Sequence, residues 1–271
     1  MLIIDAEKAN TRYWKDLFEF RELIVFLTWR NLLIRYKQTA VGIMWVLLRP
    51  LLAVVALTVV FGKIANLAAH EAVPYPLLVL SGILPWQLFS NTLADCSESI
   101  VTNSNLVSKI YFPRVIVPLS SSFAVLCDTS LTLLFASTIF LWYGVTLNWH
   151  LLFFPVALIL CWTLSFGVGL WIAAFNVKYR DFRYVIPFVL QFGLYITPVG
   201  FSSHLIQGPW KWLFSLNPLV GIIDLFRFSL LGETQTLDPF STSVSVLFSI
   251  GLLLMGTYYF RKVERHFADI I

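Results

Sequence analysis

A few charged residues stand inside otherwise apolar stretches of this sequence, and they are its most chemically informative positions. Arg49 and Asp128 occur at similar depths in two such stretches, and Asp224 and Arg227 are three residues apart. A charge exposed to hydrocarbon costs roughly 3 kcal/mol or more, so each of these side chains should face protein or water. Arg49 could pair with Asp128, and residues three apart share one helix face. Each pair could either fix helix packing or serve in gating or substrate contact.

Motifs for catalysis or nucleotide binding do not occur in the sequence. Gly62-Lys63 lacks the upstream glycine and the following hydroxyl of a phosphate-binding loop, and there is no H-E-x-x-H, paired-cysteine or G-x-S-x-G motif. The spacing of Cys96, Cys127 and Cys161 fits neither a metal site nor a disulfide framework, so we expect small buried hydrophobes. We therefore expect no catalytic residues, no metal site and no cofactor on this chain.

The composition requires a lipid environment for the elements that carry these residues. The chain is 58% hydrophobic and only 13% charged, with a mean hydropathy of +0.79. A soluble domain is about one quarter charged, so this chain could not cover a water-facing surface. The N-terminal residues carry too many charges for a cleavable signal peptide. We predict an all-α integral membrane protein.

Six apolar stretches are candidates for membrane-spanning helices, which need about 20 mostly apolar residues. They lie at about 41–62, 76–97, 114–143, 151–175, 185–200 and 240–260. The stretch 213–231 is also long enough, but Asn217-Pro218 breaks it near its start and two charges follow. A seventh span would also place the C-terminal cations opposite the N-terminal ones. We therefore predict six spans, with 201–239 as a pair of short re-entrant or interfacial helices on the outer side.

The distribution of cations sets the expected orientation. With six spans, fifteen of the 19 lysines and arginines lie on the side of both termini, and only Lys63, Lys211 and Arg227 lie outside. The positive-inside rule then makes both termini cytoplasmic. The chain divides into a tail and interfacial helix at 1–40, a six-span domain at 41–265 and a C-terminus at 266–271.

Residues 20–38 are predicted to form a helix on the inner membrane surface. Its apolar face is expected to contain Phe20, Leu23, Ile24, Leu27 and Ile34, and its cations suit an anionic leaflet. A buried extension of the first span is the alternative.

Small and aromatic residues carry two further expectations. Ser165, Gly167 and Gly169 would allow close helix approach. Aromatic residues cluster near the predicted outer boundary, at Trp142, Tyr143, Trp149, Trp210 and Trp212. They fit an interfacial aromatic belt. Some of them could instead line a path for sugars, because an aromatic face contacts sugar C–H groups.

Four segments carry a family resemblance: 35–45 (RYKQTAVGIMW) followed by Pro50, 103–114 (NSNLVSKIYFPR), 175–181 (FNVKYRD) and 216–218 (LNP). Through them the chain resembles the membrane subunits of ABC-2-type polysaccharide exporters, and O-antigen exporters most of all. The resemblance covers 20–265, and its first two motifs are fairly specific. Exporters of capsule and teichoic acid share them. The family usually has Leu-Gly where this chain has Val41-Gly42, a change that keeps the bulk and the glycine.

The resemblance implies a homodimer in the bacterial inner membrane, bound to two copies of a separate ATPase subunit that carries ATP and Mg. The implied cargo is a polysaccharide linked to undecaprenyl diphosphate. Other readings stay open: an ABC-2 permease for a drug or another lipid, a membrane enzyme acting on polyprenyl-linked glycans, and a passive channel.

The resemblance also implies three groups of site residues. The ATPase-coupling group is Asn105, Lys109, Tyr111, Phe112, Pro113, Arg114, Arg180 and Asp181. The group expected at the entrance gate and the lipid diphosphate is Arg35, Lys37, Val41, Gly42 and Arg49. The group expected at the outer gate and the sugar path is Tyr195, Phe201, Trp210, Trp212, Asn217, Pro218, Asp224 and Arg227.

Overall fold

The computed structural model describes residues 15–37, 42–71, 73–145, 148–179, 181–206, 208–232 and 237–267, and in these ranges the fold is all-helical, as predicted. Its α-helices are α2 (Arg21–Tyr36), α3 (Met44–Leu57), α4 (Tyr75–Thr102), α5 (Ser104–Lys109), α6 (Ile116–Trp142), α7 (Phe154–Lys178), α8 (Phe182–Ile196), α9 (Trp210–Ser215), α10 (Pro218–Leu231) and α11 (Pro239–Val263). Five further segments have other helix types: a π-helix η1 (Thr58–Ile64) and the 3-10 helices η2 (Leu67–His70), η3 (Trp149–Phe153), η4 (Ser203–Leu205) and η6 (Glu264–His266).

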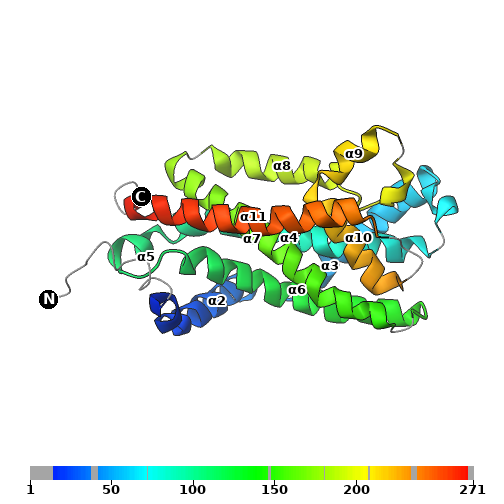
Figure 1. Cartoon of the computed structure of the whole chain (residues 1–271). Helices are drawn as coiled ribbons and strands as arrows, with labels where there is room; N and C mark the ends of the chain where they lie inside the picture. Colours follow the sequence, from blue (N-terminus) through cyan, green and yellow to red (C-terminus); the bar gives the residue numbers. More distant parts are fainter. Residues whose placement is uncertain are drawn as a thin grey trace.

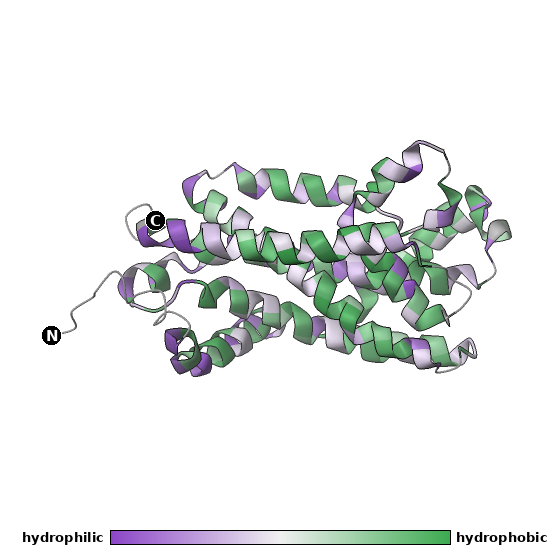
Figure 2. Ribbon diagram, viewed as in Figure 1, coloured by the Kyte–Doolittle hydropathy of each residue, from purple (hydrophilic) through white to green (hydrophobic). Residues whose placement is uncertain are grey.

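The helices form an elongated bundle with two distinct ends (Figure 1). At one end, which we call the terminal end, α2 begins, α11 finishes and α5 lies; α9 lies at the opposite, far end. Hydrophobic residues run along the length of the bundle, while hydrophilic residues gather at the terminal end (Figure 2). This pattern is the one a bilayer-spanning bundle requires.

Five helical segments are long and apolar enough to cross a membrane: Met44–Ile64, Tyr75–Thr102, Ile116–Trp142, Trp149–Lys178 and Pro239–Val263. They coincide, to within a few residues at each end, with five of the six predicted spans. The predicted fifth span is α8, an apolar helix of only 15 residues. At 1.5 Å per residue it covers roughly 22 Å, less than the 30 Å of a typical hydrocarbon core.

Helix α4 lies at the centre of the bundle, where small residues bring its neighbours close. A Cβ on Gly169 of α7 would stand 2.7 Å from the Cβ of Cys96 in α4, and one on Gly167 would stand 2.6 Å from the backbone nitrogen of Leu253 in α11. The packing role predicted for this patch is therefore confirmed. Cys96 and Cys161 are buried as predicted, but Cys127 is exposed, because it lies on a face of α6 turned away from the core.

The stretch between α8 and α11 contains the two short helices α9 and α10, in the region where short helices were predicted. Helix α10 is buried against α4, α7 and α11. The side chain of Asn217 caps its start by accepting a hydrogen bond from the backbone of Leu219 at 3.1 Å, and Pro218 follows as the first helical residue. It ends at Gly232, whose φ of +72° and ψ of −146° suit glycine alone.

Helix α2 is separate from α3 and packs along α6. Leu27 is 1% exposed and Ile34 is 70% exposed, so the two residues that the apolar pattern places on one face differ in burial within the protein. The contact face instead follows steps of four residues from Leu27 through Asn31 to Arg35, the inclined row by which packed helices interlock. Polar contacts thus replace apolar ones towards the end of α2.

Candidate functional site

At the end of α2 that lies farther along the bundle from the terminal end, one arginine joins three helices. The Nη1 atom of Arg35 lies 2.6 Å from a carboxylate oxygen of Asp128 in α6, and Nη2 donates to Asp95 in α4. The hydroxyl of Tyr36 donates to the other oxygen of Asp128 at 2.6 Å. Burial lowers the pKa of Arg35, but the two carboxylates more than offset this and raise it. These four residues, the Arg35 cluster, hold the end of α2 on the bundle through charge-assisted bonds.

The Arg35 cluster corrects the predicted pairing of Arg49 with Asp128. The partner of Asp128 is Arg35, and the side chain of Arg49 is exposed. Helix α2 lies against α6 and brings Arg35 to Asp128, an arrangement that linear spacing does not reveal. Asp95 was missed as well. Its signal was available, because it is a carboxylate inside an apolar span.

The remaining residues predicted for the entrance gate lie around the turn that follows α2. Lys37 and Arg49 are exposed, and Gly42 adopts a φ of +56° with open space around its α-carbon. Val41 lies outside the described residues. Two exposed cations therefore stand near a glycine-dependent turn, while the charge of Arg35 is already matched by carboxylates.

The segment 103–114 holds six of the residues predicted for ATPase coupling, and we call it the coupling loop; it divides into an exposed tip and a buried base. Asn105 and Lys109 are exposed, and Tyr111 is 85% exposed. Phe112 is 4% exposed and packs in an apolar cluster with Val107 and Phe260. An apolar anchor beneath an exposed aromatic tip presents the tip at a fixed position, as a docking element requires.

Two other polar contacts fix this loop. The guanidinium of Arg114 donates to the backbone carbonyl of Glu264, which ties the loop to the end of α11. Arg30 of α2 donates to the side-chain oxygen of Asn103, whose amide donates to Ser99 at 2.8 Å. Of the two predicted coupling residues outside this loop, Asp181 is exposed at the start of α8, and Arg180 lies outside the described residues.

At the far end, Arg227 of α10 is fully buried and donates hydrogen bonds to the backbone of the segment that follows α8. Its Nη2 atom donates to the carbonyls of Pro198 at 2.7 Å and Val199 at 3.1 Å, and its Nη1 atom donates to Phe201 at 3.0 Å. We call these three acceptors the carbonyl cage. Asp224 lies 4.0 Å from Nη1, the outer limit of an ion pair. The predicted pairing on one helix face is therefore present, but the carbonyls are the closer partners.

Helix α4 completes the surroundings of Arg227. A Cβ on Gly82 would lie 2.6 Å from the carbonyl oxygen of Val199 and 3.0 Å from Nη2 of Arg227, so only glycine fits there. The hydroxyl of Tyr75 donates to the carbonyl of Gly200. Gly82 and Tyr75 were not singled out from the sequence, because a close backbone approach leaves no residue pattern of its own.

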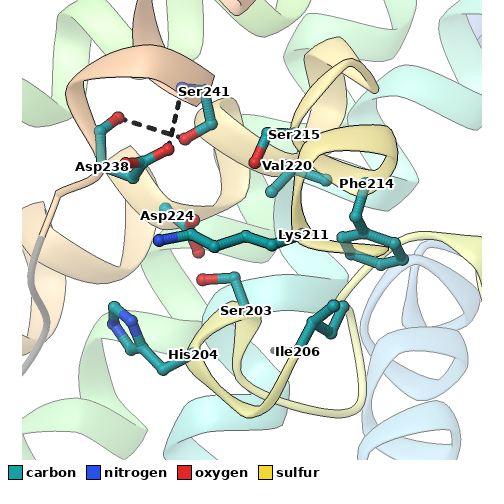
Figure 3. A pocket seen from close by; sticks show the side chains of 10 residues that line it. All are labelled: Ser203, His204, Ile206, Lys211, Phe214, Ser215, Val220, Asp224, Asp238 and Ser241. Carbon is teal, nitrogen blue, oxygen red and sulfur yellow. Dashed lines mark hydrogen bonds between the residues drawn. The ribbon is translucent and has the colours of Figure 1, made fainter. Parts of the chain in front are cut away.

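A small polar pocket lies beside α10 (Figure 3). Its volume is about 30 Å³, enough for one water molecule, and Asp224, Ser203, His204, Lys211 and Asp238 contribute to its walls. Burial raises the pKa of Asp224, and Arg227 and the hydroxyl of Ser203 act in the opposite direction. The carboxylate of Asp238 caps α11 by accepting from the backbone of Ser241 at 3.1 Å. Within the part of the chain that the structure describes, no group of three potential ligands could hold a metal ion.

The other residues predicted for the outer gate and sugar path are mostly exposed aromatics. Tyr195, Trp210 and Trp212 have exposed fractions of 62%, 67% and 66%. Phe201 is half-buried between Phe61 and Phe214. Trp210 and Trp212 come from α9, whose Phe214 contacts Phe201, and Asp224 and Arg227 lie in the protein interior.

Comparisons with known proteins cover nearly the whole chain. The sequence profile described as "ABC-2 type transporter" matches residues 22–231. The chain is 26% identical over 263 residues to the O-antigen export system permease protein RfbA of Myxococcus xanthus, a match that covers 96% of this chain and 99% of that protein. It is 27% identical over 259 residues to the protein of the same name from Klebsiella pneumoniae, covering 92% and 95%. It is 24% identical over 251 residues to the polysialic acid transport protein KpsM of Escherichia coli, covering 89% and 95%.

Proposed function

This chain belongs to the ABC-2 type transporter family, and we propose that it is the membrane subunit of an ATP-driven exporter of lipid-linked polysaccharide, with O-antigen as the cargo. The observation that carries the proposal is the near full-length similarity to export permeases for O-antigen and polysialic acid. The chain is a transport permease in this proposal. ATP and Mg bind to a separate nucleotide-binding subunit, and this chain holds no cofactor.

The proposed topology has six spans, with both termini in the cytoplasm of a bacterium. Five spans are the long apolar helices, and α8 is the sixth. Helices α9 and α10 then lie on the outer side, and α10 enters the bundle without crossing it. The burial of α10 supports this placement, since non-helical backbone at its ends is covered by protein. The terminal end is thereby cytoplasmic, which agrees with its hydrophilic residues.

Two copies of the chain form the proposed conduit. In the most apolar 18-residue stretch of α3 and its π-helical extension, only 11% of the residues are buried within the single chain, and the exposed face of α8 carries Phe188 and Tyr195. Exposed apolar faces on helices that contact few neighbours within the chain fit an interface between subunits. We propose a homodimer in which α3 and α8 border the polysaccharide path, with Tyr195, Trp210 and Trp212 offering rings to the sugars.

Substrate is proposed to enter beside the turn after α2. The diphosphate of the lipid carrier carries negative charges that Lys37 and Arg49 can meet, since both are exposed. Arg35 could bind the diphosphate as well only if its guanidinium gave up one of its carboxylate partners for a phosphate oxygen. In this proposal Val41 and Gly42 provide the gate itself, the glycine by its left-handed backbone.

ATP hydrolysis is proposed to reach the membrane through the coupling loop. Lys109 and Tyr111 form the contact with the partner, while Phe112, Pro113 and Arg114 transmit its displacement to the bundle. Asn105, Arg180 and Asp181 complete the contact surface. On the outer side, Asn217, Pro218, Phe201, Asp224 and Arg227 hold α10 and the chain before it as the outer gate.

The proposal is tested by copurification of the tagged chain with its partner from the native membrane in a mild detergent. We expect a stoichiometric ATPase, whose activity rises severalfold when polysaccharide linked to undecaprenyl diphosphate is added. The double variant K109A/Y111A should lose the ATPase. Tyr258→Ala, another exposed tyrosine, should retain it.

Three results would contradict the proposal. A chain that purifies alone and turns over polyprenyl-linked glycans would be an enzyme. A chain that conducts in liposomes without any ATPase would be a channel. Stimulation by drugs or simple lipids, but not by the lipid-linked polysaccharide, would show a permease for another cargo.

A further inference from the structure

A large cleft opens at the far end, between α6, η3, the start of α7 and the end of α10. Its volume is about 850 Å³, within the range of 300–1,000 Å³ typical of ligand sites. Apolar side chains such as Leu133, Phe140 and Leu230 make up most of its wall. None of the residues proposed above for coupling, for the entrance or for the outer gate lines it.

One buried nitrogen at this cleft has no hydrogen-bond partner among the residues that the structure describes. His150 of η3 is 3% exposed, lines the cleft, and its Nδ1 atom makes no hydrogen bond. Its ring is held by Trp149, at a centroid distance of 4.2 Å, and edge-on by Phe228 at 4.7 Å. A buried polar atom without a partner is destabilising, and two aromatic contacts keep this ring from turning out to water. The arrangement fits a nitrogen reserved for a ligand atom.

A second nitrogen converges on the same place. If Gly232 carried a Cβ, that atom would lie 3.6 Å from both Nδ1 of His150 and Nδ2 of Asn148. The absent side chain of Gly232 therefore leaves a gap of atomic size between two nitrogens, at the edge of an apolar cleft. An apolar wall with one unpartnered nitrogen at its edge suits an amphipathic molecule, with an oxygen at His150 Nδ1 and a hydrocarbon chain along the wall.

We propose that this cleft binds a bilayer phospholipid, with one acyl chain against α6 and an ester or phosphate oxygen at His150 Nδ1. The rim supports this occupant. Leu141, Trp149 and Leu152 are 60%, 62% and 77% exposed, so the cleft is bordered by apolar surface on a chain built to cross a bilayer. Phospholipid is the amphipathic molecule most abundant there, and tryptophan at a helix end is typical of the headgroup level.

The binding site is tested with a phosphatidylethanolamine that carries a photoreactive diazirine on one acyl chain. The full-length protein is reconstituted in vesicles with this probe, illuminated, and the labelled peptides are mapped by mass spectrometry. We expect label to concentrate in 133–141 and 149–155. Ser137→Trp, which places an indole in the cleft, should reduce this label at least fivefold. The control Ser130→Trp introduces the same side chain at an exposed position of α6 outside the cleft and should leave the label unchanged.

The contact with His150 is tested by native mass spectrometry of the detergent-purified protein. His150→Phe keeps both ring contacts and removes the nitrogens, so the fraction of protein with a retained phospholipid should fall threefold or more. Labelling spread evenly over the lipid-facing helices, or unaffected by Ser137→Trp, would overturn the proposal. So would retention of a polyprenyl phosphate in place of a phospholipid, or a disulfide between two copies of Leu141→Cys. These readouts need no ATPase partner, so their failure is separate from failure of the export function.

Discussion

At the scale of single residues, Arg227 shows how this protein accommodates a buried charge. Arginine cannot lose its proton in a protein, so a fully buried guanidinium must be matched by dipoles or by an opposite charge. Here the three carbonyls of the cage accept hydrogen bonds from Nη1 and Nη2, and a carboxylate oxygen of Asp224 lies 4.0 Å from Nη1. The planar fork of arginine suits several acceptors at once, which a lysine ammonium cannot reach in the same way.

Replacing Arg227 should therefore destabilise the protein more than replacing Asp224. We expect Arg227→Met to lower the free energy of unfolding by about 3–5 kcal/mol. The substitution leaves the three cage carbonyls without a hydrogen-bond donor and leaves the buried carboxylate of Asp224 without a nearby opposite charge. Asp224→Asn should cost less than half of that, since the cage remains. Thermal unfolding in detergent, followed by tryptophan fluorescence, measures both.

The matched control for this comparison is Arg183→Met, at an exposed arginine of α8, which should change stability by less than about 0.5 kcal/mol. Equal losses for Arg227→Met and Asp224→Asn would show that the ion pair, and not the cage, holds α10 in place.

At the scale of helices, contact between α10 and α11 depends on a single missing side chain. A Cβ on Gly221 would lie 2.4 Å from the carbonyl oxygen of Ser241 and 2.5 Å from the hydroxyl of Ser245. The hydroxyl of Ser245 in turn donates to the carbonyl of Pro218 at 2.6 Å. Backbone therefore meets backbone at this crossing, in the manner of close-packed membrane helices.

Gly221→Ala should force these two helices apart. The carbonyl that it meets belongs to the backbone and cannot move aside, so we expect a loss of about 1–3 kcal/mol in the free energy of unfolding. Gly251→Ala in α11 is the control, because nothing lies within 4 Å of its added methyl. A melting temperature for Gly221→Ala no lower than that of Gly251→Ala would refute the close contact.

The Arg35 cluster makes a second prediction at this scale. Asp128→Asn weakens the bonds to both Arg35 and Tyr36, so hydrogen exchange of the backbone of α2 should rise by fivefold or more. Asp95→Asn weakens only one bond and should have a smaller effect. Glu98→Gln, at an exposed carboxylate near Asp95, serves as the control. Exchange in α2 that is equal in all three variants would mean that apolar contacts around Leu27 hold the helix.

At the scale of the whole molecule, the uneven burial of the helices indicates which side would face the second subunit of the proposed homodimer. Helix α4 is largely buried, whereas α3 and its extension are not. A symmetric dimer places the same patch of each copy on the twofold axis, so residues near the axis meet their own counterparts. The exposed Leu52 and Val55 of α3 are the candidates for this position.

Cysteine cross-linking tests the proposed dimer. In a Cys127→Ser background, which removes the exposed native thiol, Leu52→Cys or Val55→Cys should form a disulfide-linked dimer in membranes on mild oxidation. Leu134→Cys, equally apolar and 67% exposed on α6, should stay monomeric. The reverse result would place the subunit interface on α6.

The sequence was sufficient for the helical class, five of the spans and the short helices between α8 and α11, because long apolar runs and a Pro-broken segment are local patterns. It also placed Lys109 and Tyr111 in one loop, but not the burial of Phe112, which depends on where the end of α11 lies. The partner of Asp128 could not be found, since α2 and α6 are distant in sequence. The carbonyl cage was equally hidden, because backbone acceptors carry no residue signature.

The carbonyl cage also bears on how the protein is made. Gly82 and the three cage carbonyls precede Arg227 in the chain, so they leave the ribosome first. At about 5–20 residues per second, the arginine follows Phe201 within roughly 1–5 seconds. Transferring this charge into hydrocarbon on an isolated helix would cost much free energy. Gly82 and the cage carbonyls, however, have already been synthesised when Arg227 is made. We therefore expect the order of synthesis to favour the insertion of α10, because the acceptors of its buried arginine are made before the arginine itself.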